Sequence, residues 1–204
     1  AYTEGCCAGG GTEVNSGLYR RPPEEVLDRW RTVAKVRDFA DDELYAICDE
    51  VERELSVQTV PGAQIPASEA LRRGAAALGW RHNEIPRWMT YATTPDGRGG
   101  DARDGRRQSM TETYLPRATA AGARLLTGHR VRRLIMDGGR AIRGEVDLPD
   151  GSPGTIDFDH VFVCGGAIQS PALLQRSGLR RHIGRTLAVH PTVKLAARFA
   201  DAIN

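Results

Sequence analysis

The chain has 204 residues, of which 40% are hydrophobic and 26% are charged, so it can form one large domain or two small ones around a buried core. The formal net charge is only +2, which excludes the strongly basic field of a nucleic-acid-binding protein or of a protein bound to an anionic membrane. No apolar run approaches the ~20 residues of a membrane span, and the first residues do not resemble a signal peptide. We therefore expect neither a nucleic acid nor a membrane as a partner.

The four cysteines of the chain show neither the spacing of a metal site nor a disulfide framework. Cys6 and Cys7 are adjacent, which is a poor geometry for a bond between them. Cys164 ends a strand-like run and is predicted to be a small buried hydrophobe, like an apolar core residue. With Cys48, these residues indicate a reducing compartment, so we expect a cytoplasmic protein without a metal site.

The first segment with a chemical signal is GCCAGGGTEVNSGLYRRPPEEVLDRW, residues 5 to 30. Successive glycines let backbone N–H groups approach a ligand that a Cβ atom would hold off, and a nearby helix N-terminus favours a phosphate. Thr12 can add a hydroxyl group, and Asn15 can donate or accept a hydrogen bond. Taken alone, the glycines fit a plain turn equally well.

Apolar residues at helical spacing predict four helices, whose stripes we interpret as core faces. The first is expected to have Pro22 and Pro23 in its first turn, and the second to begin at Asp41 or Asp42. The third is expected over residues 68 to 78 with Gly79 as C-cap, and the fourth over residues 108 to 122 with a break or kink near Pro116.

The segments between the helices leave two questions open. Residues 93 to 107 are polar and glycine-rich without periodicity, so they are predicted to form an exposed loop. Arg107 and its neighbours can hold an anion there, or they form a solvated basic face. Trp80, Trp88 and Tyr91 fit either ordinary core packing or an exposed contact patch.

From Arg124 onward the apolar pattern becomes that of strands. Residues 131 to 157 are predicted to form a small antiparallel meander, with hairpin turns at residues 137 to 139 and 150 to 151. Residues 161 to 164 form an unbroken apolar run, which is typical of a parallel strand covered on both faces. Gly165, Gly166 and a helix from about Ser170 follow, as at the ligand-binding edge of a parallel sheet.

Two segments about 150 residues apart match signatures of one enzyme family. The residues of the first signature are Gly9, Gly10, Gly11, Thr12, Glu13, Val14, Asn15, Tyr19, Pro22 and Asp28. Those of the second are Gly166, Ala167, Ser170, Pro171, Leu173, Leu174, Ser177, Gly178 and Leu179, with Arg180 in place of the last glycine. On these residues the chain resembles the glucose–methanol–choline (GMC) oxidoreductases, flavin enzymes that oxidise alcohols.

The resemblance covers nearly the whole chain and implies a mixed α+β fold (α/β class), part of an FAD/NAD(P)-binding-type domain with an antiparallel β-meander and a helical cap segment. It divides the chain into an FAD-contacting glycine turn and helix (1–30), a helical cap or substrate-side segment (31–123), the meander (124–158), a return to the FAD-domain sheet (159–190) and the start of a truncated substrate domain (191–204).

The resemblance also implies which residues contact the cofactor FAD. The predicted cofactor-binding residues are Gly9, Gly10, Thr12, Val14, Asn15, Ser16, Val131, Gly165 and Gly166. Some members of the family attach FAD covalently through a histidine at the position of Val14. Valine cannot form that bond, so the flavin is expected to bind non-covalently.

Two parts of the family pattern have no match in this sequence. Members of the family open with a strand and G-x-G-x-x-G, which binds the FAD pyrophosphate. Their catalytic histidine and its His or Asn partner lie further along the chain than the position that corresponds to Asn204. His190 resembles a structural motif, and His82, His129, His160 and His182 are expected on the surface or in loops. We therefore expect an internal fragment with no catalytic residue of its own, inactive by itself and binding FAD weakly or not at all.

For the parent protein, the resemblance implies that an alcohol gives a hydride to FAD while a histidine base takes the hydroxyl proton. The expected partner is thus a small-molecule alcohol, whose identity and acceptor chemistry the sequence does not fix. The alternative is a non-catalytic interaction or scaffold module derived from the same fold. A nicotinamide-dependent dehydrogenase fits less well, because it too needs the absent fingerprint.

Overall fold

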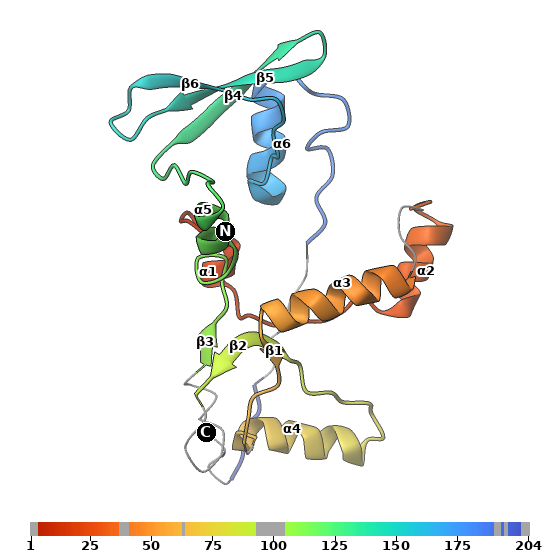
Figure 1. The fold of residues 1–204 in the computed structure, drawn as a ribbon. Helices are drawn as coiled ribbons and strands as arrows, with labels where there is room; N and C mark the ends of the chain where they lie inside the picture. The colour runs from red at the N-terminus through yellow and green to blue at the C-terminus, as the bar shows by residue number, and fades with distance from the viewer. Residues whose placement is uncertain are drawn as a thin grey trace. The chain divides into compact units, whose positions relative to one another are not determined.

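The computed structural model describes residues 4–36, 41–62, 64–92, 105–189, 193 and 196–200. The chain divides into two compact units, drawn in Figure 1. Unit 1 comprises Ala1–Ala123 with Arg198–Asn204, and unit 2 comprises Arg124–Ala197. Each is described by itself below. Both combine helices with antiparallel strands, so the predicted mixed α+β class is confirmed.

Unit 1 is built from five helices and one three-stranded antiparallel sheet within its described residues. The helices are α1 (Gly11–Val14), α2 (Glu24–Thr32), α3 (Asp41–Glu54), α4 (Pro66–Ala77) and α5 (Tyr114–Ala120), and the strands are β1 (Val57–Gln58), β2 (Arg87–Tyr91) and β3 (Gly105–Arg107). β2 is the central strand, with Val57 opposite Trp88 and Met89 opposite Arg107. Trp88 and Met89 are buried, so they form core, whereas Trp80 is 67% exposed.

α2 begins just after the two prolines, Pro22 and Pro23, that the sequence placed in its first turn. Pro23 is its N-cap, and Glu24 and Glu25 place negative charge on the first turn, where the helix dipole favours it. Leu27 is the one fully buried apolar side chain of this helix, with 0% of its surface exposed. α3 begins at Asp41, one of the two predicted starts.

An ion pair network joins the segment before α2 to α3. The Arg21 guanidinium donates to both carboxylate oxygens of Glu52, with 2.6 Å between Nη2 and Oε2, and it also reaches Asp49. These hydrogen bonds hold the pKa of Glu52 below its ordinary value, and Tyr19 adds a further hydrogen bond. The pKa of Tyr19 is in turn raised by burial and by the neighbouring Glu52 carboxylate.

Replacing Glu52 by glutamine is expected to flatten the dependence of thermal stability on pH in the acid range. Because the pKa of Glu52 is lowered on folding from its ordinary 4.5, the ionised pair stabilises the fold above that value. This stabilisation is lost as the pH falls through the lower pKa of the folded state. Thermal melts at a series of acid and neutral pH values test this, with Glu50→Gln on the exposed side of the same helix as control. Parallel wild-type and Glu52→Gln curves would contradict it.

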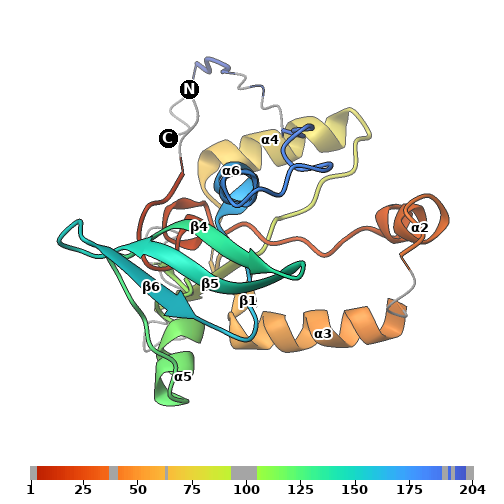
Figure 2. The ribbon, with the colours of Figure 1, turned by 90° about the horizontal axis from the view of Figure 1, so that it is seen from above.

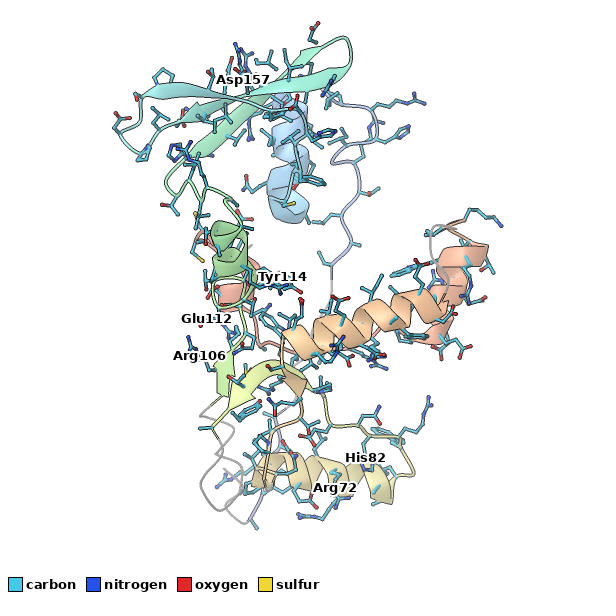
Figure 3. The ribbon with its side chains drawn as sticks, in the orientation of Figure 1. Arg72, His82, Arg106, Glu112, Tyr114 and Asp157 are labelled. Carbon is cyan, nitrogen blue, oxygen red and sulfur yellow. The ribbon has the colours of Figure 1, made fainter. Side chains whose placement is uncertain are left out.

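The predicted fourth helix is shorter than expected. Residues 110 to 113 are turns, and α5 begins only at Tyr114, so Pro116 lies in its first turn instead of kinking a longer helix. A proline fits there because the first N–H groups of a helix have no intrahelical partner. Figure 3 shows Tyr114 reaching toward α3, where its hydroxyl donates to Glu54, and Arg117 also pairs with Glu54 at 3.0 Å.

The predicted exposed loop at 93 to 107 is corrected at its end. Residues 93 to 104 lie outside the described ranges, whereas Gly105–Arg107 form β3 and pair with β2. An alanine Cβ at Gly105 would lie 2.7 Å from the Tyr91 ring, so the close pairing of the two strands depends on glycine there. Figure 3 shows Arg106 beside Glu112, with which it forms an ion pair.

Unit 2 is the predicted meander followed by a helix. β4 (Arg130–Asp137), β5 (Arg140–Asp147) and β6 (Pro153–Asp157) form an antiparallel sheet in chain order, as Figure 2 shows. Gly138, Gly139 and Gly151 have positive φ angles in the two hairpin turns, so both predicted turns are confirmed.

The helix of unit 2 packs on this sheet. α6 (Gly166–Arg176) contacts β4, and Leu134 on β4 and Val146 on β5 are buried. The Ser177 hydroxyl, just after α6, accepts a hydrogen bond from the Leu134 N–H at 2.8 Å and fixes the end of the helix to the strand. Cross-strand ion pairs join Arg132 to Asp147, Arg133 to Glu145 and Arg143 to Asp157.

The predicted buried strand at residues 161 to 164 is wrong for this structure. These residues are not in a strand, Phe162 is 89% exposed, and Cys164 is exposed instead of buried. A strand covered on both faces needs neighbouring strands, and no parallel pair occurs among the strands that the structure describes. α6 also begins four residues before the predicted start, at Gly166.

None of the helices in the described ranges is long and apolar enough to cross a membrane.

Candidate cofactor site

The glycine turn is a tightly wound backbone segment that leads into α1. Gly9 and Gly10 have φ angles of +81° and +54°, which residues other than glycine rarely adopt. The Gly10 N–H donates to the Cys7 carbonyl at 3.0 Å, and the Thr12 N–H donates to the Gly9 carbonyl at 3.1 Å. Gly5 crosses this turn so closely that an added Cβ would lie 2.6 Å from the Gly10 carbonyl oxygen.

One face of the turn is open. A Cβ atom added at Gly10 or Gly11 would meet no atom within 4 Å, so the backbone there can be approached by a ligand. Val14 is 65% exposed beside them, and Asn15 and Ser16 are exposed. We call Gly10, Gly11 and Val14 the open face.

The Asn15 amide is oriented by the turn that follows α1. Its Oδ1 accepts a hydrogen bond from the Gly17 N–H at 2.9 Å, so the Nδ2 group lies on the other side of the amide. Nδ2 is a donor, and it is therefore the part of this side chain that can serve an acceptor on a ligand.

The opposite face of the turn is held by a segment almost 100 residues further along the chain. Arg107 Nη1 donates to the Glu13 carbonyl, and the Met110 N–H donates to the Thr12 hydroxyl at 3.2 Å. The Thr111 hydroxyl donates to Glu13 Oε1 at 2.6 Å. We call Arg107, Ser109, Met110 and Thr111 the 107–111 clamp.

The Glu13 carboxylate is the electrostatic centre of this contact. Hydrogen bonds from Thr111 and Ser109 hold its pKa below the ordinary value, and the charge of Arg107 acts in the same direction. Ser109 is 2% exposed, and its Oγ lies 3.0 Å from the Thr111 Oγ1. An ionised carboxylate that accepts these bonds ties the turn to a buried hydroxyl group.

Arg107 and its neighbour Arg106 lie in different surroundings. Arg106 is exposed and pairs with Glu112, as a solvated basic face requires, whereas Arg107 is half-buried and bonded to the glycine turn. Its Nε atom is buried and finds no acceptor within the described parts of the chain. The basic-face interpretation is therefore wrong for Arg107.

The Thr12 hydroxyl is committed to the turn itself. It donates to the Gly9 carbonyl at 2.5 Å while it accepts from the Met110 N–H. Its proton is therefore not available to a ligand, and its predicted role as a cofactor-binding residue stays a prediction.

The predicted site residues are distributed over both units. Gly9, Gly10, Thr12, Val14, Asn15 and Ser16 lie together in unit 1, and Val131, Gly165 and Gly166 lie in unit 2. Val131 is on β4 opposite Val146 and is 39% exposed. Gly165 is the N-cap of α6, and Gly166 has a φ angle of +78° with open space at its Cβ position.

The four histidines within the described ranges lie in loops, one in unit 1 and three in unit 2. His82, His160 and His182 are exposed, and His129 is half-buried with Nδ1 2.9 Å from the Thr127 carbonyl oxygen. His190 lies outside the described residues. In the part of the chain that the structure describes, no group of three or more His, Cys, Asp or Glu residues could hold a metal ion.

Sequence reasoning missed the contribution of Gly5 and of the clamp. The glycine run Gly9–Gly11 was visible as a pattern, but Gly5 matters through a contact with a turn five residues away. Ser109 and Thr111 lie in the segment that the sequence predicts as a helix, and no local signal marks their bonds to Glu13.

Comparison with known proteins adds a family to this geometry. The model of the GMC oxidoreductase family matches residues 1–192. An uncharacterised GMC-type oxidoreductase of Sinorhizobium fredii is 38% identical over 208 residues, which cover 100% of this chain and 41% of the relative. One of Mycobacterium tuberculosis is 36% identical over 211 residues, covering 98% and 32%. A long-chain-alcohol oxidase of Arabidopsis thaliana is 26% identical over 210 residues, covering 97% and 28%.

The chain thus spans about two fifths or less of the length of these relatives. The family model, in contrast, extends over almost all of it, through both signature segments and both units. The chain belongs to the GMC oxidoreductase family.

Proposed function

We propose that this chain is the FAD-contacting part of an FAD-dependent oxidoreductase that acts on the CH–OH group of an alcohol. The family match over residues 1–192 supports the enzyme class, and the long-chain-alcohol oxidase among the relatives supports the alcohol. The structural observation that carries the proposal is the open face, where the backbone of Gly10 and Gly11 is accessible beside the exposed Val14.

The residues of the turn fit such a cofactor. A flat ring system or a phosphate approaches a backbone closely only where no Cβ atom intervenes, and both glycines leave that space empty. In this proposal the backbone of Gly9 and Gly10 and the Asn15 Nδ2 group hold the flavin, while Val14 packs against it without a covalent bond. The predicted FAD contacts of Val131, Gly165 and Gly166 in unit 2 remain part of this proposal.

When bound, FAD supplies the acceptor for the hydride of the alcohol. The chain's own residues bind and orient it, and the turn is fixed for this task before the ligand arrives. We assign no catalytic residue within the 204 residues, and we propose that they do not turn over an alcohol alone and bind FAD weakly or not at all. The predicted division into turn, cap, meander and sheet-return segments and the cytoplasmic location remain part of this proposal.

Gly11→Ala in the full-length gene product is expected to weaken FAD binding about tenfold without loss of stability. The added methyl group protrudes into the open face, where nothing of the chain contacts it, so it obstructs only a ligand. Alanine also suits the first residue of α1 better than glycine does. The measurements are FAD titration by flavin fluorescence and a thermal melt of the apoprotein.

The matched control is Gly74→Ala in α4, which also adds a methyl group to empty space within a helix. It is expected to leave FAD binding unchanged. Unchanged affinity in Gly11→Ala would show that the open face is not the flavin side. A full-length wild-type protein that never binds FAD would overturn the proposed function and leave the interaction or scaffold module.

A further inference from the structure

We infer that Arg107, Ser109 and Thr111 are positioning residues for the FAD-binding turn, acting through Glu13 and never touching the cofactor themselves. This inference rests on the proposed function, and it assigns a role to three side chains that neither signature contains.

The clamp binds the turn on one side only. α1 has only one turn, so its residues divide between two sides: Gly11 and Val14 are open, whereas Thr12 and Glu13 face the clamp. The clamp contacts side-chain and backbone atoms of Thr12 and Glu13 in three separate hydrogen bonds. Three bonds from different directions fix both the position and the rotation of so short a helix.

The residues that the clamp binds are themselves hydrogen-bonded to the residues at the open face. The Thr12 and Glu13 N–H groups donate to the carbonyls of Gly9 and Gly10, at 3.1 Å each. The hydroxyl of Thr12 bonds the same Gly9 carbonyl while it accepts from Met110. A displacement of Thr12 or Glu13 is therefore passed directly to Gly9 and Gly10, of which Gly10 belongs to the open face.

The surroundings of Arg107 favour orientation of the turn over stability of the fold. A buried guanidinium Nε without an acceptor costs stability, because the group loses its hydration and gains no hydrogen bond in return. Arg107 nevertheless places one Nη on the Glu13 carbonyl and its charge near the Glu13 carboxylate. A side chain that lowers the stability of the fold but holds the turn in place is expected where the position of the turn is needed for ligand binding.

The test uses the full-length protein and two readouts, the FAD dissociation constant and the melting temperature of the apoprotein. Thr111→Val, which removes the hydroxyl but keeps the shape, is expected to weaken FAD binding roughly tenfold. Thr111→Ser keeps the hydroxyl and is expected to restore affinity to within about twofold. Thr119→Val is the matched control, because that hydroxyl bonds carbonyls of its own helix, those of Leu115 and Pro116.

Arg107→Met separates positioning from folding. It removes both the buried Nε, which has no acceptor among the described residues, and the bond to Glu13. The melting temperature is therefore expected to stay or rise while FAD affinity falls roughly tenfold. This variant also keeps the inference testable if Thr111→Val does not fold.

Equal loss of affinity in Thr111→Val and Thr111→Ser would overturn the inference, as would wild-type affinity in both Thr111→Val and Arg107→Met. A fall of affinity in Arg107→Met that only accompanies a fall in melting temperature would reduce the clamp to a structural contact. If the wild-type protein binds no FAD, the proposed function fails, and this inference fails with it; wild-type binding with unaffected variants rejects the inference alone.

Discussion

Gly9→Ala is expected to weaken FAD binding by tenfold or more and to destabilise unit 1. The φ angle of +81° costs a residue with a Cβ atom about 1–2 kcal/mol, and the new Cβ would also meet the Glu13 carboxylate at 2.3 Å between Cβ and Oε1. Glu13 must then move away from Thr111, so the substitution strains the turn and breaks its link to the 107–111 clamp. FAD titration and thermal melts of the full-length variant measure the two effects.

Gly122→Ala is the control that introduces the backbone strain of a positive φ angle without moving Glu13. Gly122 follows α5 with a φ angle of +96°, but an added Cβ there meets no atom within 4 Å. It is therefore expected to lower stability by about 1 kcal/mol and to leave FAD binding unchanged. If the two variants lost FAD affinity equally, the effect at Gly9 would be general destabilisation and not displacement of Glu13.

Leu27→Ala is expected to cost about 2–5 kcal/mol of the free energy of unfolding. Leu27 is the fully buried apolar residue of α2, so its removal gives up the transfer energy of the side chain and leaves a cavity. Urea unfolding followed by circular dichroism measures the change.

The control for Leu27→Ala is Leu71→Ala in α4, where the side chain is 76% exposed. The same chemical change there is expected to shift the free energy of unfolding by no more than about 0.5 kcal/mol. A small effect at Leu27, equal to that at Leu71, would mean that α2 is not part of the cooperative core.

The meander was predictable because its signals are local. Glycines with positive φ angles mark both hairpin turns, and each strand pairs with the next one along the chain, so neighbours in sequence decide the pairing. The start of α2 was predictable to within two residues for the same reason, since Pro23 directly precedes the helix and Glu24 and Glu25 lie in its first turn. α3 begins at Asp41, one of the two predicted residues.

Elements that depend on distant partners were not predictable. β3 exists because Gly105–Arg107 find β2, which the polar composition of that stretch does not indicate. Residues 161 to 164 have the composition of a covered strand, yet composition cannot supply the neighbours that such a strand requires. The candidate site divides in the same way: the glycine turn is visible in the sequence, but the clamp joins residues 94 to 98 positions apart.

The ion pairs on the sheet of unit 2 have a consequence for how its strands find one another. Exposed pairs such as Arg133 with Glu145 and Arg143 with Asp157 add little to stability. Their value lies in discrimination: a shift of two positions that kept the faces of β4 and β5 would bring Arg133 opposite Arg143, and two like charges would then oppose each other. The surface charges of this meander therefore favour the native register over a slip in that direction, which its apolar face alone would accept.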